Sequence, residues 1–97
     1  GGLRLSEQSV NLAIIMSIVS SVLNRPIPNA TVFIAEVGLT GELKKVPSLE
    51  TRIKELDRMG FKKVYIPEGG LKSKERIENI EVVELRTLIE VIKDVFP

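Results

Sequence analysis

The 97-residue chain contains no cysteine, no histidine and no tryptophan. Without cysteine the chain can form no disulfide bond, and it lacks the thiolate and imidazole ligands of most zinc sites. The absence of histidine removes the commonest general acid or base from any catalytic mechanism. A chain without cysteine agrees with a reducing compartment, so we expect a cytoplasmic protein.

Aromatic side chains and long apolar runs are also scarce. Aromatic residues make up 4% of the chain and all stand in apolar surroundings typical of a core: Phe33, Phe61, Tyr65 and Phe96. We therefore expect no stacking of nucleic-acid bases on this chain. The longest apolar stretch, Leu12 to Val19, is too short to cross a bilayer and has no basic leader. Neither a membrane span nor a signal peptide is expected.

Charge is nearly balanced overall but unevenly distributed. The 14 basic and 13 acidic side chains leave a net charge of +1, and a hydrophobic content of 43% is ordinary for one soluble globular domain. Basic side chains concentrate in the middle of the chain: Lys44, Lys45, Arg52, Lys54, Arg58, Lys62 and Lys63. Such a cluster can face phosphate groups. The alternative is a solvated surface of mixed charge.

The first strong pattern along the chain is helical. Apolar residues recur with helical spacing from Glu7 to about Asn24, with Ser6 as the expected N-cap. Asn24 precedes Arg25 and Pro26 and is expected to end the helix. Because one side carries large aliphatic residues and the other only small ones, we predict a core helix sandwiched between layers.

The rest of the chain alternates strands with helices. Helices are predicted from Ser48, as N-cap, to Met59 and again after Thr87, with a short helical turn at Ser73 to Ile77. Apolar runs predict four β-strands: Thr31 to Ala35, Leu43 to Val46, Lys63 to Pro67 and Ile80 to Leu85. This order indicates a two-layer α/β or α+β domain.

Residues Glu36 to Glu42 predict a tight connection between the first two of these strands. Its glycines, Gly38 and Gly41, are expected where the backbone needs a positive φ or a close approach. At the N-terminus, Gly1 to Leu5 is typical of a strand without a partner. If, as the resemblance given below implies, Leu3 to Leu5 have lost a strand partner, an exposed sheet edge and self-association are expected.

Short motifs carry a resemblance to a known family. They are Ser-Ser-x-x-x-Arg-Pro at residues 20–26, Glu-Val-Gly-Leu-Thr-Gly-Glu at 36–42, Arg-Ile-Lys-Glu at 52–55, and Gly-Phe-Lys-Lys at 60–63 followed by Ile66-Pro67. With these motifs, nearly the whole chain resembles the C-terminal domain of the bacterial RadA (Sms) DNA-repair and recombination proteins.

The resemblance implies a fold and a domain organisation. The C-terminal domain of that family is similar to the proteolytic domain of Lon and to domain 2 of ribosomal protein S5. Residues 1–97 are then a single domain without the family's N-terminal strands, a fragment of a longer protein. The family's zinc finger and RecA-like ATPase, with their Zn, ATP and Mg, would lie outside this chain. We expect no cofactor or metal in residues 1–97.

The resemblance to Lon raises the question of peptidase activity. Lon-type peptidases use a Ser-Lys dyad, in which a neutral lysine takes the proton of the attacking serine. Ser9 falls at the nucleophile position, whereas Glu50 falls at the lysine position. A carboxylate there would be ionised and would repel a forming oxyanion, so we predict no enzymatic activity. The alternative is an active Ser-Lys peptidase, with Lys44 or Lys45 replacing the missing base.

Two non-catalytic roles remain, and they can coexist. One is a scaffold, because Lon-type domains form rings; this predicts a homo-oligomer. The other is a platform that holds DNA by its backbone, independently of sequence, while the intact protein acts in recombination. The DNA-binding candidates are Lys44, Lys45, Lys54, Arg58, Lys62 and Lys63. Arg52 points to another side of its predicted helix.

Overall fold

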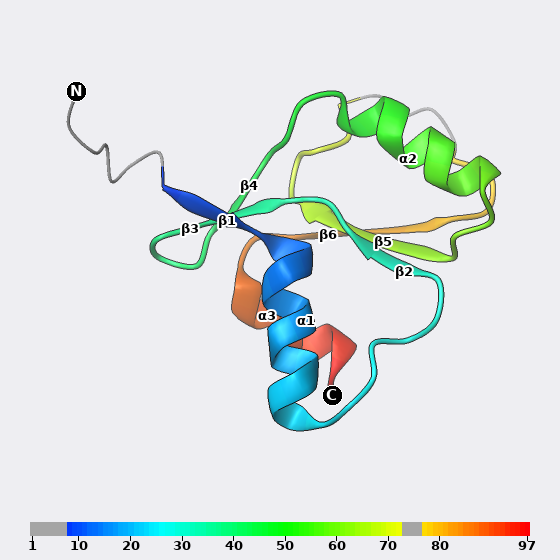
Figure 1. Cartoon of the computed structure of the whole chain (residues 1–97). Coiled ribbons are helices and arrows are strands. Elements are labelled where there is room, and N and C mark those ends of the chain that lie inside the picture. The colour runs from blue at the N-terminus through cyan, green and yellow to red at the C-terminus, as the bar shows by residue number, and fades with distance from the viewer. Residues whose placement is uncertain (1–7, 73–76) are drawn as a thin grey trace.

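The computed structural model describes residues 8–72 and 77–97, which form a small α/β domain (Figure 1). Two three-stranded sheets and three helices make up this described part of the chain. In chain order the elements are β1 (Ser9–Asn11), α1 (Leu12–Leu23), β2 (Thr31–Phe33), β3 (Glu36–Gly38), β4 (Leu43–Lys44), α2 (Leu49–Arg58), β5 (Lys63–Pro67), β6 (Glu81–Leu85) and α3 (Leu88–Val95). The predicted α/β class is confirmed.

The two sheets differ in strand direction but share one stretch of backbone. The first sheet is antiparallel in the order β1-β3-β4, and the second is parallel in the order β2-β5-β6. Only Ile34 and Ala35 separate β2 from β3, so one nearly continuous extended segment belongs to both sheets. Ile34 N–H donates to the Tyr65 carbonyl at 2.9 Å, which carries the β2–β5 pairing into this link.

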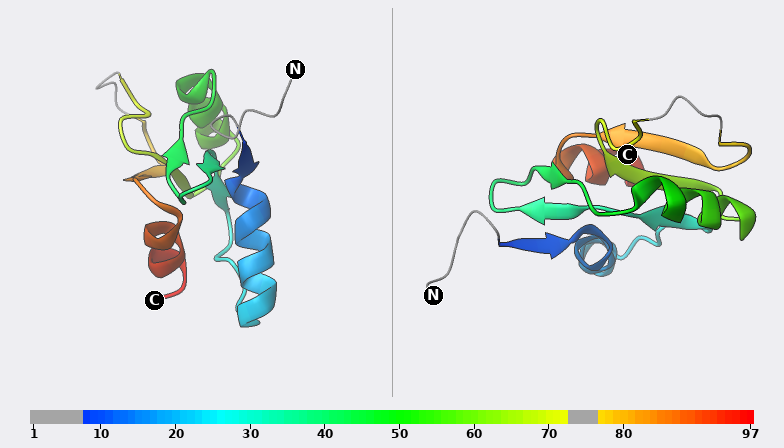
Figure 2. Two further views of the ribbon diagram at one scale, coloured as in Figure 1. Left: turned by 90° about the vertical axis from the view of Figure 1, so that its left-hand side faces the viewer. Right: turned by 90° about the horizontal axis from the view of Figure 1, so that it is seen from above.

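Helices cover both faces of the parallel sheet, which differs from the two-layer arrangement predicted above (Figure 2). The side chains of β5 point alternately to the two faces of the sheet, because successive residues of a strand point in opposite directions. The core between this sheet, α1 and α3 contains Leu12, Met16, Phe33, Ala35, Val37, Tyr65, Val91, Val95 and Phe96. The core beneath α2 contains Ile34, Leu49, Ile53, Val64, Ile66 and Ile80. The apolar run from Thr31 to Ala35, predicted as a strand, therefore has side chains buried on both faces of the sheet.

Tyr65 anchors α3 to the sheet. Its ring stacks on Phe33 with centroids 5.3 Å apart, and its hydroxyl donates to Asp94 Oδ2 at 2.5 Å. Burial and the Asp94 carboxylate raise the pKa of Tyr65 above its ordinary value. The tyrosine thus stays protonated and acts as a hydrogen-bond donor across the core.

The start of α1 differs from the prediction. A helix beginning at Glu7 is wrong, because Ser9–Asn11 is extended and pairs antiparallel with β3. Asn11 is the N-cap, and its side-chain oxygen accepts from the amides of Ala13 at 2.8 Å and Ile14 at 3.3 Å. This local cap and the strand pairing together stop the helix from extending backward. The predicted N-cap, Ser6, lies outside the described residues, as does the strand predicted within Gly1 to Leu5.

The predicted end of α1 is confirmed at Asn24. This residue adopts a left-handed conformation with φ 53°, and its amide bonds back to the last turn of the helix. The Ser20 hydroxyl then donates to the carbonyl of Arg25, whose guanidinium lies 5.4 Å from the Phe96 ring centroid. The Ser-Ser-x-x-x-Arg-Pro motif therefore ties the end of α1 to the end of the chain.

The prediction of α1 as a sandwiched core helix is wrong. Leu12 and Met16 are buried, but Ile14, Ile18 and Val22 are exposed. Within the described chain, α1 packs on the sheet and α3 with one side only, and its other side faces outward (Figure 2). The helical period was read correctly, but an apolar pattern does not say which of its faces will find a partner.

The Glu36 to Glu42 segment is a strand and a turn rather than a connection alone. Its first three residues form β3, and a tight turn then leads into β4. The prediction for the glycines is confirmed: Gly41 has φ +85°, and a Cβ on Gly38 would lie 2.5 Å from the Glu42 carboxyl group. Leu88 N–H, at the start of α3, donates to the Gly41 carbonyl at 2.8 Å. The turn therefore also fixes the position of the first residue of α3.

The other predicted elements are confirmed with small shifts of their ends. β5 has the predicted bounds, whereas β2 and β4 are shorter and β6 begins one residue later. α2 begins after Ser48 as predicted and ends at Arg58, one residue before the predicted end at Met59. The helical turn predicted at Ser73 to Ile77 lies almost wholly outside the described residues.

Thr87 begins α3 with a reciprocal capping box. Its hydroxyl accepts from the Glu90 amide at 3.2 Å, and the Glu90 carboxylate accepts from the Thr87 amide at 3.0 Å. Backbone amides of Arg86 and Thr87 that donate to this carboxylate lower the pKa of Glu90. The predicted Thr87 cap is confirmed.

Thr87→Ala should lower the free energy of unfolding by about 1 kcal/mol, because it leaves first-turn amides of α3 without their acceptor. Urea unfolding followed by circular dichroism measures this change. Thr51→Ala, on the exposed surface of α2, is the matched control and should not destabilise the chain. Equal midpoints for the Thr87 variant and the unaltered chain would contradict the role of the cap.

Candidate functional site

Ser9, the candidate nucleophile, is bound to a carboxylate. It lies in β1, opposite Gly38 of β3, and its hydroxyl donates to Glu36 Oε1 at 3.0 Å. In the antiparallel register Glu36 is opposite Asn11, two residues from Ser9, so both side chains extend from the same face of the sheet. The hydroxyl is partly buried and points its proton at an acid, not at an amine.

Glu50, at the position of the lysine of Lon, lies elsewhere in the fold. It stands in the first turn of α2 and lines a cleft to which Ser9 does not contribute. β1 and the start of α2 lie at separate places in the domain (Figure 1). The structure therefore does not bring the two predicted dyad positions together.

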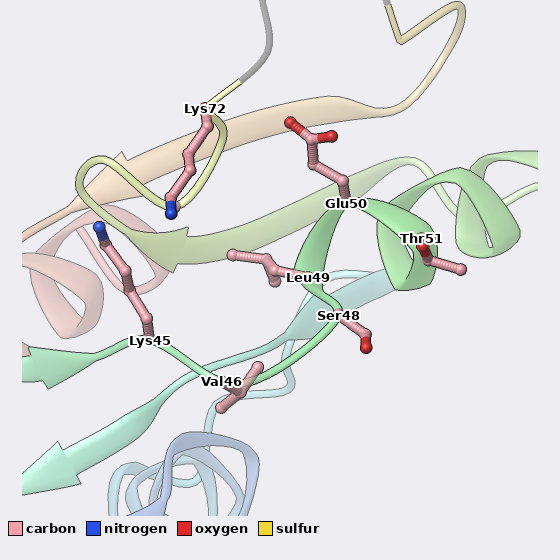
Figure 3. Close-up of a pocket in the computed structure, with 8 residues that line it drawn as sticks. Lys45, Val46, Ser48, Leu49, Glu50, Thr51 and Lys72 are labelled. Carbon is pink, nitrogen blue, oxygen red and sulfur yellow. The ribbon is translucent and has the colours of Figure 1, made fainter.

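The cleft around Glu50 has a volume of about 570 Å³. Its walls come from the segment between β4 and α2, the first turn of α2, and the loop after β5: Lys45, Val46, Ser48, Leu49, Glu50, Thr51, Gly70 and Lys72. Figure 3 shows the ammonium groups of Lys45 and Lys72 on one side of this cleft, past the end of the Leu49 side chain, and the Glu50 carboxylate at the first turn of α2. Two lysines and one glutamate thus line the cleft beside the start of α2.

The N-terminus of α2 is open toward the cleft. Ser48 occupies the N-cap position with φ 58°, and in the described structure its side chain makes no cap hydrogen bond. The first amides of a helix carry a partial positive charge and need acceptors, which a bound anion can supply. Ser48 was predicted to cap α2, and the position is confirmed, but its hydroxyl does not satisfy these amides.

Gly70 brings Lys72 to the cleft. A Cβ on Gly70 would lie 2.6 Å from Leu49 Cδ2 and 2.9 Å from the Pro67 carbonyl oxygen. The loop can approach α2 this closely only because residue 70 has no side chain. Lys72 was missed by sequence reasoning, since it is far along the chain from Lys45. The glycine pair after β5 was the available signal.

The other predicted basic residues are distributed over the domain. Lys63 lies 3.6 Å from Asp94 and 5.3 Å from the Tyr65 ring centroid, so it faces α3. Arg58 pairs with Glu55 at 2.6 Å on the exposed side of α2. None of Lys44, Lys54 and Lys62 lines the cleft. Of the predicted DNA-binding residues, the cleft contains Lys45 alone.

The described part of the chain offers little else of chemical use. No helix in residues 8–72 and 77–97 has the length and apolar character needed to cross a bilayer. Within the same residues, no group of three or more acidic side chains is arranged to hold a metal ion. The basic cleft and the Ser9–Glu36 pair are the features that a function must use or explain.

Comparisons with known proteins place this small α/β domain in a family. The model of the family described as "Subunit ChlI of Mg-chelatase" matches residues 2–70. The chain therefore belongs to the ChlI family.

The chain is also similar to proteins named DNA repair protein RadA. It is 40% identical to the Streptococcus pyogenes serotype M3 protein over 99% of this chain, and 40% identical to the Haemophilus influenzae protein over 95%. It is 35% identical to the Listeria monocytogenes protein over its whole length. The chain spans about a fifth of the length of these relatives, 20–21%. The resemblance to RadA stated from the motifs is confirmed.

Gly70→Ala should lower the free energy of unfolding by about 1–3 kcal/mol, because the new methyl group meets backbone at Pro67 as well as Leu49. Chemical unfolding monitored by circular dichroism gives the value. Lys72→Ala in the same loop is the control and should stay within about 0.5 kcal/mol, since its side chain is exposed. If Gly70→Ala is as stable as that control, the close packing described here is incorrect.

Proposed function

We propose that this chain is a non-catalytic Lon-like domain of a RadA-type DNA-repair and recombination protein. It holds the DNA backbone in the cleft at the start of α2 and takes part in self-assembly. The observation that carries the proposal is that Lys45 and Lys72 line one cleft at the start of α2, where Ser48 makes no side-chain cap hydrogen bond. It occurs in a chain that is similar over 99% of its length to a DNA repair protein.

The DNA contact follows from the chemistry of the cleft. A phosphate group needs cations and N–H donors, and the cleft is lined by two lysines and by the first turn of α2, whose N-cap side chain makes no cap hydrogen bond. The Glu50 carboxylate in the same cleft offsets part of this positive charge. The aromatic residues Phe33, Tyr65 and Phe96 are buried and cannot stack on bases. Contact with phosphates alone does not read sequence. The expected ligand is therefore the sugar-phosphate backbone of DNA of any sequence.

The surroundings of Ser9 support the proposed absence of catalysis. A Lon-type serine needs a neutral amine as proton acceptor, whereas this hydroxyl donates to Glu36. An ionised carboxylate beside the attacking oxygen would oppose the negative charge that develops in acyl transfer. Glu50, in turn, lies in the cleft and not beside Ser9. On this proposal, the domain has the fold of a Lon-type hydrolase but binds DNA without catalysing a reaction.

The Lon-like fold and the assembly rest mainly on the resemblance. Ser9 lies in β1, and Val10 and Asn11 separate it from α1, whereas the nucleophile position in Lon stands at the start of the corresponding helix. The S5 domain 2-like fold is therefore proposed from the resemblance alone. Ring assembly is supported by the outward apolar side of α1. ATP hydrolysis, with its Mg, and the zinc site would belong to other domains of such a cytoplasmic protein.

Fluorescence anisotropy with labelled DNA tests the backbone contact. We expect binding at low salt that is equal for unrelated sequences and weakens steeply as salt rises, because bound lysines release counterions from phosphates. The double substitution Lys45→Gln/Lys72→Gln should weaken binding and make the slope of log affinity against log salt shallower by about 1–2.

Lys93→Gln is the matched control, because this exposed lysine lies in the last turn of α3, outside the cleft. It should leave the salt slope unchanged. The proposed DNA contact would be contradicted if the double variant bound DNA like the unaltered chain, or if the unaltered chain bound no DNA at low salt.

A peptidase assay tests the absence of catalysis. With an unstructured fluorogenic peptide, we expect the chain to show the same background rate as Ser9→Ala, because Ser9 has no amine base. Ser17→Ala, which alters an exposed serine of α1, is the control for contaminating activity. A rate that survives in Ser17→Ala and is lost in Ser9→Ala would establish a peptidase instead.

A further inference from the structure

Glu50 is an acidic residue in a cleft that otherwise attracts anions. It is partly buried in the first turn of α2, and its carboxylate stands in the same cleft as the ammonium groups of Lys45 and Lys72 (Figure 3). The polar side chains of Ser48 and Thr51, which also line the cleft, are uncharged. Among the described residues, the lining therefore carries the positive charges of two lysines and the negative charge of one glutamate.

One turn of the backbone brings the two lysines together. The turn after β5 leads to Lys72, and its Gly69 has φ +75°. Lys45 Nζ lies against the same turn, 3.6 Å from the position that a Cβ on Gly69 would occupy. A carboxylate that does not line the cleft, Glu84, holds the turn by accepting from the Gly69 amide at 2.8 Å. The lysines are therefore brought to the cleft by a tethered segment.

Glu50 is near enough to act on any anion in the cleft. A cavity of about 570 Å³ is about 10 Å across, so an ion inside it lies within about one screening length of each lining charge at physiological salt. The carboxylate also interacts favourably with the partial positive charge of the first turn of α2 and so competes with a bound anion for it. Glu50 thus weakens the attraction of the cleft for a phosphate group.

This weakening affects the two kinds of phosphate ester differently. Coulomb attraction grows in proportion to the charge of a ligand, whereas the free energy needed to remove the ligand from water grows roughly with the square of that charge. A phosphodiester within a DNA strand has a single negative charge, and a terminal phosphomonoester has nearly two at neutral pH. A cleft of modest positive potential therefore favours the diester, and a strongly positive cleft favours the monoester.

We propose that Glu50 makes the cleft at α2 selective for the phosphodiester groups inside a DNA strand and against phosphomonoesters, such as the phosphate at a strand end. The inference rests on the DNA contact of the proposed function and specifies its ligand. It gives Glu50 a role in binding, as the residue that limits the positive charge of the cleft. It does not depend on how the chain assembles.

Titration of the isotope-labelled 97-residue chain with methyl phosphate and with dimethyl phosphate tests this selectivity. The two compounds are similar in shape but differ by one charge at about pH 8. NMR shifts of the first amides of α2 give both affinities. We expect the unaltered chain to bind dimethyl phosphate at least as tightly as methyl phosphate. Glu50→Gln should raise affinity about threefold for each negative charge on the ligand, by Coulomb's law in water at about 7 Å, and so reverse this order.

Glu55→Gln is the matched control, because it removes the same charge from an exposed position of α2 outside the cleft. It should leave both affinities as they are in the unaltered chain. Circular dichroism confirms that each variant is folded.

Three results would overturn the selectivity: tighter binding of methyl phosphate by the unaltered chain, equal behaviour of the Glu50 and Glu55 variants, or no shift of the first α2 amides with either compound. If the unaltered chain still binds DNA in the anisotropy assay, the proposed DNA contact stands without this role of Glu50. If it binds no DNA either, both proposals are wrong.

Discussion

Two consecutive buried residues, Ile34 and Ala35, hold the domain together. The Ile34 amide bonds to the Tyr65 carbonyl of the parallel sheet, and the Ala35 carbonyl accepts from the Leu12 amide at 2.9 Å. Their side chains point into different cores, Ile34 beneath α2 and Ala35 beneath α1. Both sheets, both cores and the first turn of α1 thus meet at this short link between β2 and β3.

The link also explains how the functional features arise. With Leu12 fixed at Ala35, the residues before it must extend along β3, which sets Ser9 next to Glu36. The same attachment fixes the rotation of α1, so that Leu12 and Met16 face the core and Ile18 faces outward. On the other face of the sheet, α2 is held by Leu49 and Ile53, and its first turn opens toward Lys45. The cleft at α2, the outward side of α1 and the Ser9–Glu36 pair are consequences of one packing arrangement.

Local signals predicted much of this fold. The capping box at Thr87, the left-handed Asn24 and the turn glycine Gly41 depend on nearby residues, and each was found where the sequence indicated. The strands β1 and β3 were missed, because three-residue strands have too little periodicity to compete with the neighbouring helical pattern. Which side of α1 is covered depends on long-range packing. The helical spacing of apolar residues in the sequence does not reveal that packing.

The site was predictable only in part for the same reason. Lys45 was recognised, but Lys72 joins it through a loop whose approach depends on Gly70 packing against Leu49. The resemblance to Lon supplied Ser9 and Glu50, but the bond from Ser9 to Glu36 requires the β1–β3 register, which was not foreseen. Side chains brought together by tertiary contacts were therefore missed, whereas those marked by motifs were found.

The proposed lack of peptidase activity depends on Ser9, whose hydroxyl donates to the Glu36 carboxylate in place of the neutral amine of a Lon-type dyad. Intact-mass and peptide mapping after exposure of the folded chain to a fluorophosphonate, which labels activated serines, tests this directly. We expect Ser9 to be labelled no faster than the exposed Ser17. Rapid, stoichiometric labelling of Ser9 that is abolished by unfolding the chain would contradict the account.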